Sequence, residues 1–412
     1  MTSKAVFRAL RRCTESLCLI FLSLFIKRDN HTIAIGSWNG ERYADNSRYL
    51  AEYIAKERPE LKIIWVGKAE IQNEVQENLP EADFAEINTF SGNLKLLKSR
   101  YMFFSQMHNA DISSCNVYRK AITCYLHHGM PIKKWGKDGL NQESLSGNRF
   151  RKAYYHVVGT DIQYDYFVTS SPLHDKTNCT AMAEQGCNEG KNIHTGTPRN
   201  DIFFHASETE IVKMKEKYGK ILNFGTEKRV ILYLPTYRRT ETNVFSFSAL
   251  PEEEREQIHE LLHKNNSILI EKSHYTEKNH FEGGSDDCIL CVPSRMNAQE
   301  LMLFSDILIS DYSGAFLDFL ILDRPIIHYL YDYQYYKNVD SGLYYEPEEF
   351  CAGKTAYRFE ELAEGMKEIL TGEEDKYRDR RRDIRDKFMS YEKGNASERI
   401  ISAVMEEQRG KR

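Results

Sequence analysis

The chain has 412 residues, of which 41% are hydrophobic and 28% charged, a composition typical of globular proteins that excludes a disordered chain. That length exceeds what one hydrophobic core usually serves, so we expect two domains. The formal net charge of -5 excludes a protein that binds nucleic acid through its overall charge, and we expect no nucleic-acid partner. The 9 cysteines are odd in number and scattered, which indicates a reduced intracellular protein.

The first thirty residues are the one membrane-like feature of the sequence. Residues 17–26 are strongly apolar, basic residues such as Lys4 and Arg8 precede them, and Lys27 and Arg28 follow. The apolar run is shorter than the ~20 residues that span a bilayer, and no small-residue cleavage site of a signal peptide follows it. We therefore expect a basic, amphipathic segment that lies on an anionic membrane surface. The alternative is a buried first helix.

Strand and helix patterns then alternate along the chain. Such alternation predicts parallel sheets covered by helices, with functional groups at the carboxyl ends of the strands. The expected strands of the first half are residues 32–35, 61–66, 82–87, 101–104, 121–126 and 165–170, with helices at residues 46–55 and 93–99 among them. A second alternation includes strands at residues 229–234, 267–271 and 287–291.

Turn-forming residues are dense at 196–201, and we place the domain boundary just after them. The sequence then divides into a membrane-association segment (1–30), an N-terminal Rossmann-like domain (31–203), a C-terminal Rossmann-like domain (204–375) and charged C-terminal helices (376–412). Two α/β halves of similar size that face one another would form a cleft.

Residues 306–331 form the most informative stretch. Residues 307–309 have the apolar pattern of a buried parallel strand, and Asp311, Ser313 and Gly314 follow it in a small polar turn before a helical pattern. Free backbone N–H groups and the positive end of a helix dipole suit a phosphate at such a turn. The alternative is an ordinary strand–helix turn.

Two adjacent histidines follow the expected strand at 121–126. His128 precedes a glycine at the strand end, and its near-neutral pKa makes it a candidate general base. Lys133 and Lys134 would supply positive charge beside it. We expect His127 to cap or pack the turn.

His274 ends a strand of the second half, where an imidazole can stabilise charge on a leaving phosphate or simply support the structure. Arg199 stands on a rigid turn and suits a bidentate phosphate contact, although it could equally pair with Asp201.

Metal chemistry finds little support in the sequence. Cys288 and Cys291 form a single C-x-x-C without a second pair, so we expect them to pack in the core and not to bind zinc. The aspartates form no convincing metal-binding pair, and we expect a reaction that needs no metal or cofactor.

Five segments, in order along the chain, resemble motifs of the CDP-glycerol glycerophosphotransferase family, which assembles teichoic acids and related capsules. The opening segment comprises residues 36–40 and 45–50, and residues 128–136 resemble the family's His-Gly-Thr-Pro-Leu-Lys signature. Residues 196–201 are similar to its Gly-x-Pro-Arg-Asn-Asp turn, and residues 232–238 to its Leu-Tyr-Ala-Pro-Thr-Trp-Arg strand. Residues 310–318 resemble its Thr-Asp-Tyr-Ser-Ser-x-x-Phe-Asp element.

The resemblance implies a GT-B-like α/β fold in which the first Rossmann-like domain holds the acceptor and the second the nucleotide donor. It implies transfer of glycerol phosphate from CDP-glycerol, or of another polyol phosphate from a similar CDP-polyol, to a lipid-linked acceptor with release of CMP. His128 and His274 would be catalytic, and Lys133 and Lys134 would bind the acceptor. The implied donor-binding residues are Arg199, Thr236, Arg238, Asp311, Ser313, Gly314 and Asp318.

The implied location is the cytoplasm, peripherally on the inner face of the cell membrane. Four positions depart from the family pattern: His127, Met130, Tyr275 and Gly314 replace Trp, Thr, Pro and Ser. The departures leave the reaction type intact and the donor and acceptor open. Two alternatives remain, a GT-B glycosyltransferase that uses a nucleotide sugar and a non-catalytic scaffold.

Overall fold

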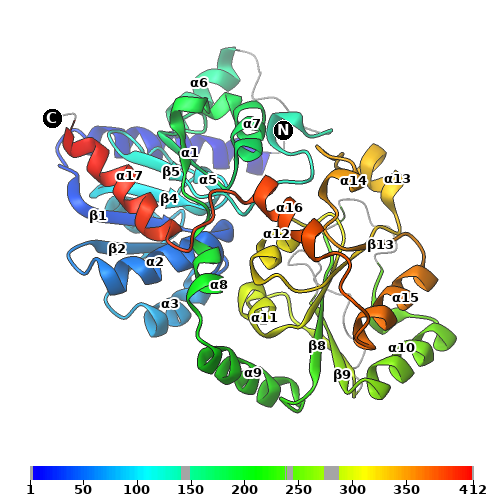
Figure 1. The fold of residues 1–412 in the computed structure, drawn as a ribbon. Coiled ribbons are helices and arrows are strands. Elements are labelled where there is room, and N and C mark those ends of the chain that lie inside the picture. Colours follow the sequence, from blue (N-terminus) through cyan, green and yellow to red (C-terminus); the bar gives the residue numbers. More distant parts are fainter. Residues whose placement is uncertain (1–2, 141–148, 237, 239–244, 273–286, 411–412) are drawn as a thin grey trace. The chain divides into compact units, whose positions relative to one another are not determined.

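The structure is a computed structural model that describes residues 3–140, 149–236, 238, 245–272 and 287–410. By their internal contacts the residues form two compact units (Figure 1). Unit 1 comprises Met1–His128, Gln142–Asp201 and Tyr391–Arg412, and unit 2 comprises Gly129–Asn141 and Ile202–Ser390.

Unit 1 is built on a parallel sheet of 7 strands in the order β3-β2-β1-β4-β5-β6-β7. The central strands are apolar and buried, as expected of strands covered on both faces; β1, for example, buries its last five residues. The strands are β1 (Asp29–Gly36), β2 (Lys62–Gly67), β3 (Asp83–Glu86), β4 (Ser99–Phe104), β5 (Ile122–Tyr125), β6 (Tyr166–Thr169) and β7 (Asn192–His194).

Helices connect these strands and complete the core of unit 1. Leu50 and Ile54 of α2 pack in one cluster with Trp65 of β2 and with Ile400 and Val404 of α17. The helices are α1 (Ser3–Leu22), α2 (Asp45–Glu57), α3 (Gln72–Asn78), α4 (Phe90–Leu96), α5 (His108–Asp111), α6 (Arg149–Val158), α7 (Pro172–Ala181) and α17 (Ala396–Gly410).

Unit 2 is built on a parallel sheet of 6 strands in the order β10-β9-β8-β11-β12-β13. Its strands are β8 (Arg229–Leu234), β9 (Ser267–Lys272), β10 (Ile289–Val292), β11 (Ile307–Ser310), β12 (Ile326–Tyr329) and β13 (Lys354–Ala356). Its helices are α8 (Asp201–His205), which begins at the last residue of unit 1, α9 (Glu208–Leu222), α10 (Glu252–Lys264), α11 (Ala298–Phe304), α12 (Ala315–Phe319), α13 (Tyr333–Tyr335), α14 (Pro347–Phe350), α15 (Phe359–Leu370) and α16 (Arg378–Phe388).

The observed units differ from the predicted division in two places. Residues 129–141 belong to unit 2, because Lys134 N donates to Gly342 O (3.0 Å) and Tyr344 N donates to Ile132 O (2.9 Å). The end of the chain does not form a separate helical segment from residue 376. Helix α16 belongs to unit 2, whereas α17 returns to unit 1, where Asp201 accepts the N–H of Ala396 (2.8 Å).

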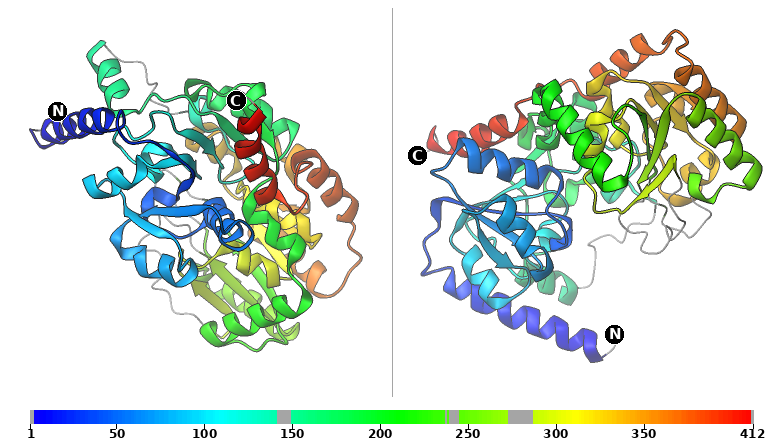
Figure 2. Two further views of the ribbon diagram at one scale, coloured as in Figure 1. Left: turned by 90° about the vertical axis from the view of Figure 1, so that its left-hand side faces the viewer. Right: turned by 90° about the horizontal axis from the view of Figure 1, so that it is seen from below.

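Helix α1 lies along the outside of unit 1 (Figure 2). Ser16 and Leu19 are buried, but Phe7, Leu10 and Phe21 are 70%, 61% and 59% exposed. Because these three residues lie 3 and 11 positions apart, they share one face of the helix. No helix among the described residues is long and apolar enough to cross a membrane.

Candidate active site

The histidine turn of unit 1 follows β5, at the carboxyl end of the parallel sheet. His127 has a φ of 62° and Gly129 a φ of 107°, both in the left-handed region. For a histidine this conformation is strained by about 1–3 kcal/mol and persists only where neighbours hold it. Asn46 does so, because its Nδ2 donates to the carbonyl oxygens of Leu126 (3.2 Å) and His127 (2.8 Å).

The two histidines of this turn have different environments. His127 is buried, and its Nδ1 accepts the backbone N–H of His128 (3.0 Å), so it packs and caps the turn as predicted. The side chain of His128 is exposed, and its ring stacks on His127 at 5.1 Å. An exposed imidazole on a fixed turn can exchange a proton with a bound substrate.

His174 of α7 packs against His127 of this histidine pair. Its ring meets His127 edge-on at 4.6 Å, and its Nδ1 accepts the backbone N–H of Ser170 (3.2 Å). Burial, together with the nearby His128, lowers the pKa of His174 to about 3, so the ring is neutral near pH 7. Sequence reasoning missed both His174 and the side-chain role of Asn46. The one signal for Asn46 was its place in the opening motif.

Arg199 does not lie on the surface as a phosphate ligand. Its guanidinium is buried and contacts Asp45 at 2.8 Å, with side-chain exposures of 9% and 4%. The backbone N–H of Arg199 donates to Asn46 Oδ1 (3.1 Å), so this turn also orients the amide that holds the histidine turn. The predicted alternative partner, Asp201, instead accepts hydrogen bonds at the start of α17. Arg199 therefore braces unit 1.

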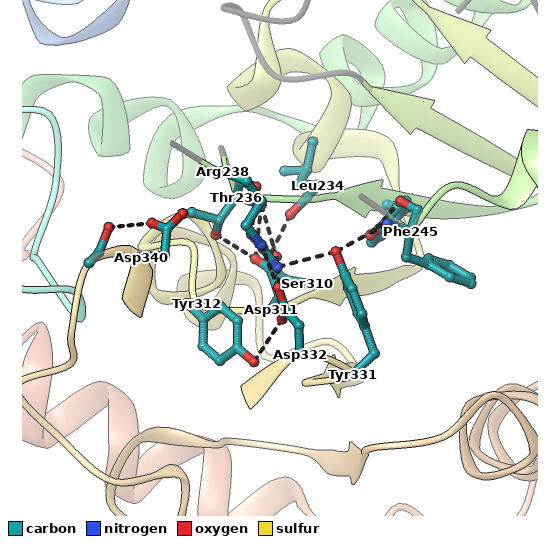
Figure 3. A network of polar contacts seen from close by, with 12 residues as sticks. Leu234, Thr236, Arg238, Phe245, Ser310, Asp311, Tyr312, Tyr331, Asp332 and Asp340 are labelled. Carbon is teal, nitrogen blue, oxygen red and sulfur yellow. Dashed lines mark hydrogen bonds and ion pairs between the residues drawn. The ribbon is translucent and has the colours of Figure 1, made fainter. Parts of the chain in front are cut away.

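In unit 2 the predicted donor residues Thr236, Arg238 and Asp311 meet at the carboxyl ends of β8 and β11 (Figure 3). Asp311 is fully buried and accepts hydrogen bonds from the N–H (2.9 Å) and the hydroxyl of Thr236. Arg238 contacts Asp311 at 2.9 Å and Asp332, just beyond β12, at 2.7 Å.

Three tyrosine rings surround the Arg238 guanidinium. Its carbon lies 4.7 Å from the ring centre of Tyr336, 5.3 Å from that of Tyr312 and 5.6 Å from that of Tyr331. Burial opposes the charge of Arg238, but Asp311 and Asp332 raise its pKa well above the usual value, so the group stays charged. Thr236, Arg238, Asp311 and Asp332 therefore pair with one another at the carboxyl ends of β8, β11 and β12.

The polar turn after β11 combines a half-buried serine with a close backbone contact. Ser313 Oγ accepts the N–H of Ala315 (3.3 Å), and α12 is only 5 residues long. A Cβ on Gly314 would lie 2.7 Å from the carbonyl oxygen of Met130, so a serine at this position is excluded unless the backbone shifts. Asp318 is 1% exposed in α12 and lies inside the unit.

The remaining residues that the sequence singled out lie in different parts of the chain. Lys133 and Lys134 are half-buried on the segment of unit 2 that pairs with residues 342–344, and not in unit 1 where they were expected. Cys288 is buried in the core of unit 2, as predicted, and Cys291 is half-buried. His274 lies outside the described residues.

Comparison with known proteins extends this picture. The sequence matches the CDP-Glycerol:Poly(glycerophosphate) glycerophosphotransferase family over residues 18–406. It is 26% identical to the teichoic acid poly(glycerol phosphate) polymerase of Bacillus subtilis (strain 168), over 95% of this chain and 50% of that protein. It is 28% identical to the teichoic acid glycerol-phosphate transferase of Staphylococcus aureus (strain NCTC 8325 / PS 47), over 91% of this chain and 93% of that protein.

Solved structures agree on the fold. The wall teichoic acid polymerase TagF superposes with a TM-score of 0.76 at 20% identity, covering 98% of each chain. The UDP-GlcNAc 2-epimerase from Neisseria meningitidis superposes with a TM-score of 0.54 at 14% identity, covering 92% of this chain and 100% of that chain. At these identities the likeness shows the fold alone.

Two parallel-sheet α/β units with polar groups at the carboxyl ends of their strands define an α/β fold of the GT-B type. The family match is more specific, because it covers most of the chain. The chain belongs to the CDP-Glycerol:Poly(glycerophosphate) glycerophosphotransferase family, which confirms the resemblance seen in its motifs. It is a glycerophosphotransferase-like enzyme. It spans about half the length of the B. subtilis relative and 93% of the S. aureus relative.

Proposed function

We propose that the chain transfers glycerol phosphate, or a related polyol phosphate, from a CDP-activated donor to a hydroxyl of a lipid-linked, teichoic-acid-type acceptor, releasing CMP. Family membership supports this substrate class, and two relatives are named for glycerol-phosphate polymerisation and transfer. The single observation that carries the chemistry is the exposed His128 on a turn that Asn46 fixes at the carboxyl end of β5.

In the proposed reaction an imidazole nitrogen of His128 takes the proton of the acceptor hydroxyl. The hydroxyl oxygen attacks the phosphorus that bears the polyol, a new P–O bond forms, and the bond to the CMP oxygen breaks. No metal or cofactor is needed for the proton transfer. His274 remains a second catalytic candidate through the family resemblance.

For the binding of the donor, we propose a smaller set of residues than the resemblance implies. Thr236, Arg238, Asp311 and Arg199 act as braces through the pairs described above. Ser313 and the backbone at Gly314 remain candidates for the diphosphate of the donor, and Lys133 and Lys134 for phosphates of the acceptor.

The test is CMP release by the purified protein with CDP-glycerol, CDP-ribitol and UDP-sugars. We expect CMP from a CDP-polyol and none from UDP-sugars. His128→Ala should lower CMP release by at least about 10²-fold, the usual contribution of general-base catalysis. Binding of CDP-glycerol, measured separately, should change little.

The matched control is His156→Ala, because His156 is another exposed histidine of unit 1. Turnover that survives in His128→Ala would show that His128 is not the base. Release of UDP from a nucleotide sugar would point to a glycosyltransferase, and no release from any donor would favour a scaffold.

We further propose that the enzyme lies in the cytoplasm, peripherally on the inner face of the cell membrane, through α1. The exposed apolar face that contains Phe7, Leu10 and Phe21 is flanked by the exposed basic residues Arg8 and Arg11. An apolar face beside positive charge suits the interface of an anionic bilayer.

Sedimentation with phospholipid vesicles tests this placement. The wild-type protein should bind vesicles that contain anionic lipid and bind less as salt rises. Phe7→Ser with Phe21→Ser should abolish that binding. As a control, Val212→Ser with Ile221→Ser alters two exposed apolar residues of α9 and should leave it unchanged. Equal binding of both double variants would contradict the proposal.

A further inference from the structure

A cluster of four potential metal ligands lies in unit 2. His259 and His263 come from α10, and Asp287 and Cys288 immediately precede β10. Each offers one ligand atom, and these four atoms all lie within 4.8 Å of one another. Among the described residues, this is the group of three or more histidine, cysteine and acidic side chains close enough to hold an ion.

The local structure explains why these side chains converge. His259 and His263 are four residues apart, so they project from the same face of α10. Cys288 is fixed from the other side, because its carbonyl oxygen accepts the N–H of Leu269 in β9 (2.8 Å). The side chain of Cys288 is fully buried in the core of unit 2, whereas those of His263 and Asp287 are 50% and 67% exposed. The cluster is therefore held in the core at Cys288 and is open to solvent at His263 and Asp287.

The donor set indicates the type of ion. Two imidazoles, one thiolate and one carboxylate match the ligands of Zn²⁺, whereas Mg²⁺ and Ca²⁺ prefer oxygen ligands only. With Zn²⁺ bonds of about 2.0–2.3 Å, tetrahedral ligand atoms lie roughly 3.3–3.8 Å apart. The His263 Nε2–Asp287 Oδ2 distance is 3.2 Å, close to that spacing. The other ligand atoms lie no more than 4.8 Å apart, so binding an ion would require some of them to approach one another.

Within unit 2 the cluster lies at the opposite end of the sheet from the polar turn after β11. The C-terminal half of α10 and the beginning of β10 lie at the amino end of the parallel sheet. Thr236 and Asp311 lie at the carboxyl end. Among the described residues, β10 is also an edge strand of the sheet and pairs with β9 alone. An ion held between α10 and β10 would fasten this edge to the helix that covers it.

We propose that His259, His263, Asp287 and Cys288 bind one Zn²⁺, which clamps α10 to the edge strand β10 and takes no part in phosphate transfer. Bound zinc would hold the thiol of Cys288 as a thiolate, a form that burial alone disfavours. Because the ligands converge only in the folded chain, zinc would stabilise unit 2 against unfolding.

The test uses the full-length protein stripped of metal with a chelator and titrated with Zn²⁺ or Co²⁺. One Co²⁺ per chain should bind with a thiolate-to-metal charge-transfer band and the visible bands of tetrahedral coordination. At a hundredfold excess of Zn²⁺ over its Kd, Tm should rise by about 5–10 °C. Neither readout depends on enzymatic activity, so the result is independent of the proposed function.

Matched variants assign the ligands. His263→Gln changes an exposed side chain and should weaken binding at least about tenfold. Cys288→Ser should remove the charge-transfer band, whereas Cys291→Ser, three residues further on in β10, should retain it. His156→Gln alters an exposed His–Asp pair of unit 1, in which His156 lies 3.3 Å from Asp161, and should leave binding unchanged. The proposal is overturned if the wild-type protein shows no saturable binding, or if His263→Gln and Cys288→Ser bind as the wild type does.

Discussion

Replacing Arg238 by methionine should loosen the carboxyl ends of three strands at once. The guanidinium is 1% exposed and contacts Asp311 at 2.9 Å and Asp332 at 2.7 Å (Figure 3). It also donates to the carbonyl oxygen of Thr236 (2.7 Å). Methionine fills similar volume and keeps contacts with the tyrosine rings, but it supplies no positive charge and no donor.

The expected cost follows from the burial of the partners. Asp311 is fully buried, so removing its cation leaves a buried carboxylate without charge compensation, which costs about 3–5 kcal/mol. Asp332, with a side chain 16% exposed, can recover part of its loss from water. The double variant Arg238→Met with Asp311→Asn should cost less than the sum of the single variants, because the unpaired charge is gone.

Hydrogen exchange followed by mass spectrometry measures this in the intact protein. Since each ~1.4 kcal/mol is a factor of ten, protection of the amides in β8 and β11 should fall by about 10²–10⁴-fold. Peptides of unit 1 serve as the internal control. If the amides of β8 and β11 in Arg238→Met kept exchange protection within tenfold of the wild type, Arg238 would not hold these strand ends together. If the KM for the donor then rose instead, Arg238 would be a donor ligand after all.

Two further predictions concern unit 1. Asp45→Asn and Arg199→Met should each destabilise unit 1 by about 3 kcal/mol, and the double variant by clearly less than their sum, because each single change leaves one buried charge unpaired; exchange of α2 amides measures this, and strictly additive losses would contradict it. Acid should also destabilise unit 1, because burial lowers the pKa of His108 to about 4 and that of His174 to about 3, and this outweighs the opposite effect of Asp111, whose pKa burial raises to about 7. Between pH 6.5 and 4 the unfolded state binds more protons at these histidines than the folded state does, so stability is retained above pH 6.5 and falls with pH by up to about 1.4 kcal/mol per unit for each histidine. A midpoint of urea unfolding that is the same at pH 7 and pH 5 would argue against this.

The sequence predicted the strands well where the pattern is local. Residues 307–309 are a short apolar run, and they form most of β11 because a run of apolar side chains suits a strand that is buried on both faces. The division of His127 and His128 into a packing and an exposed residue also followed from local features, a strand end and a glycine.

Partners distant along the chain were beyond sequence reasoning. Arg199 was weighed against a phosphate or Asp201, but its partner is Asp45, 154 residues earlier. Lys133 and Lys134 were placed by their nearness to His128 in sequence, whereas backbone pairing with residues 342–344 puts them in unit 2. In the sequence Gly314 is only a departure from the family's serine, whereas in the structure the nearby carbonyl of Met130 leaves no room for a side chain. Such contacts depend on the folded backbone and leave no periodic pattern.

The position of α17 sets an order in time. Ile400, Ile401 and Val404 complete the hydrophobic cluster of unit 1, yet Ile202–Ser390 is synthesised between them and the rest of that unit. At roughly 5–20 residues per second the ribosome needs about 10–40 s for that stretch. During this interval the hydrophobic residues of unit 1 that α17 will cover stay exposed while unit 2 is synthesised. A chain that ends at Ser390 should therefore be cut by protease mainly within residues 1–201.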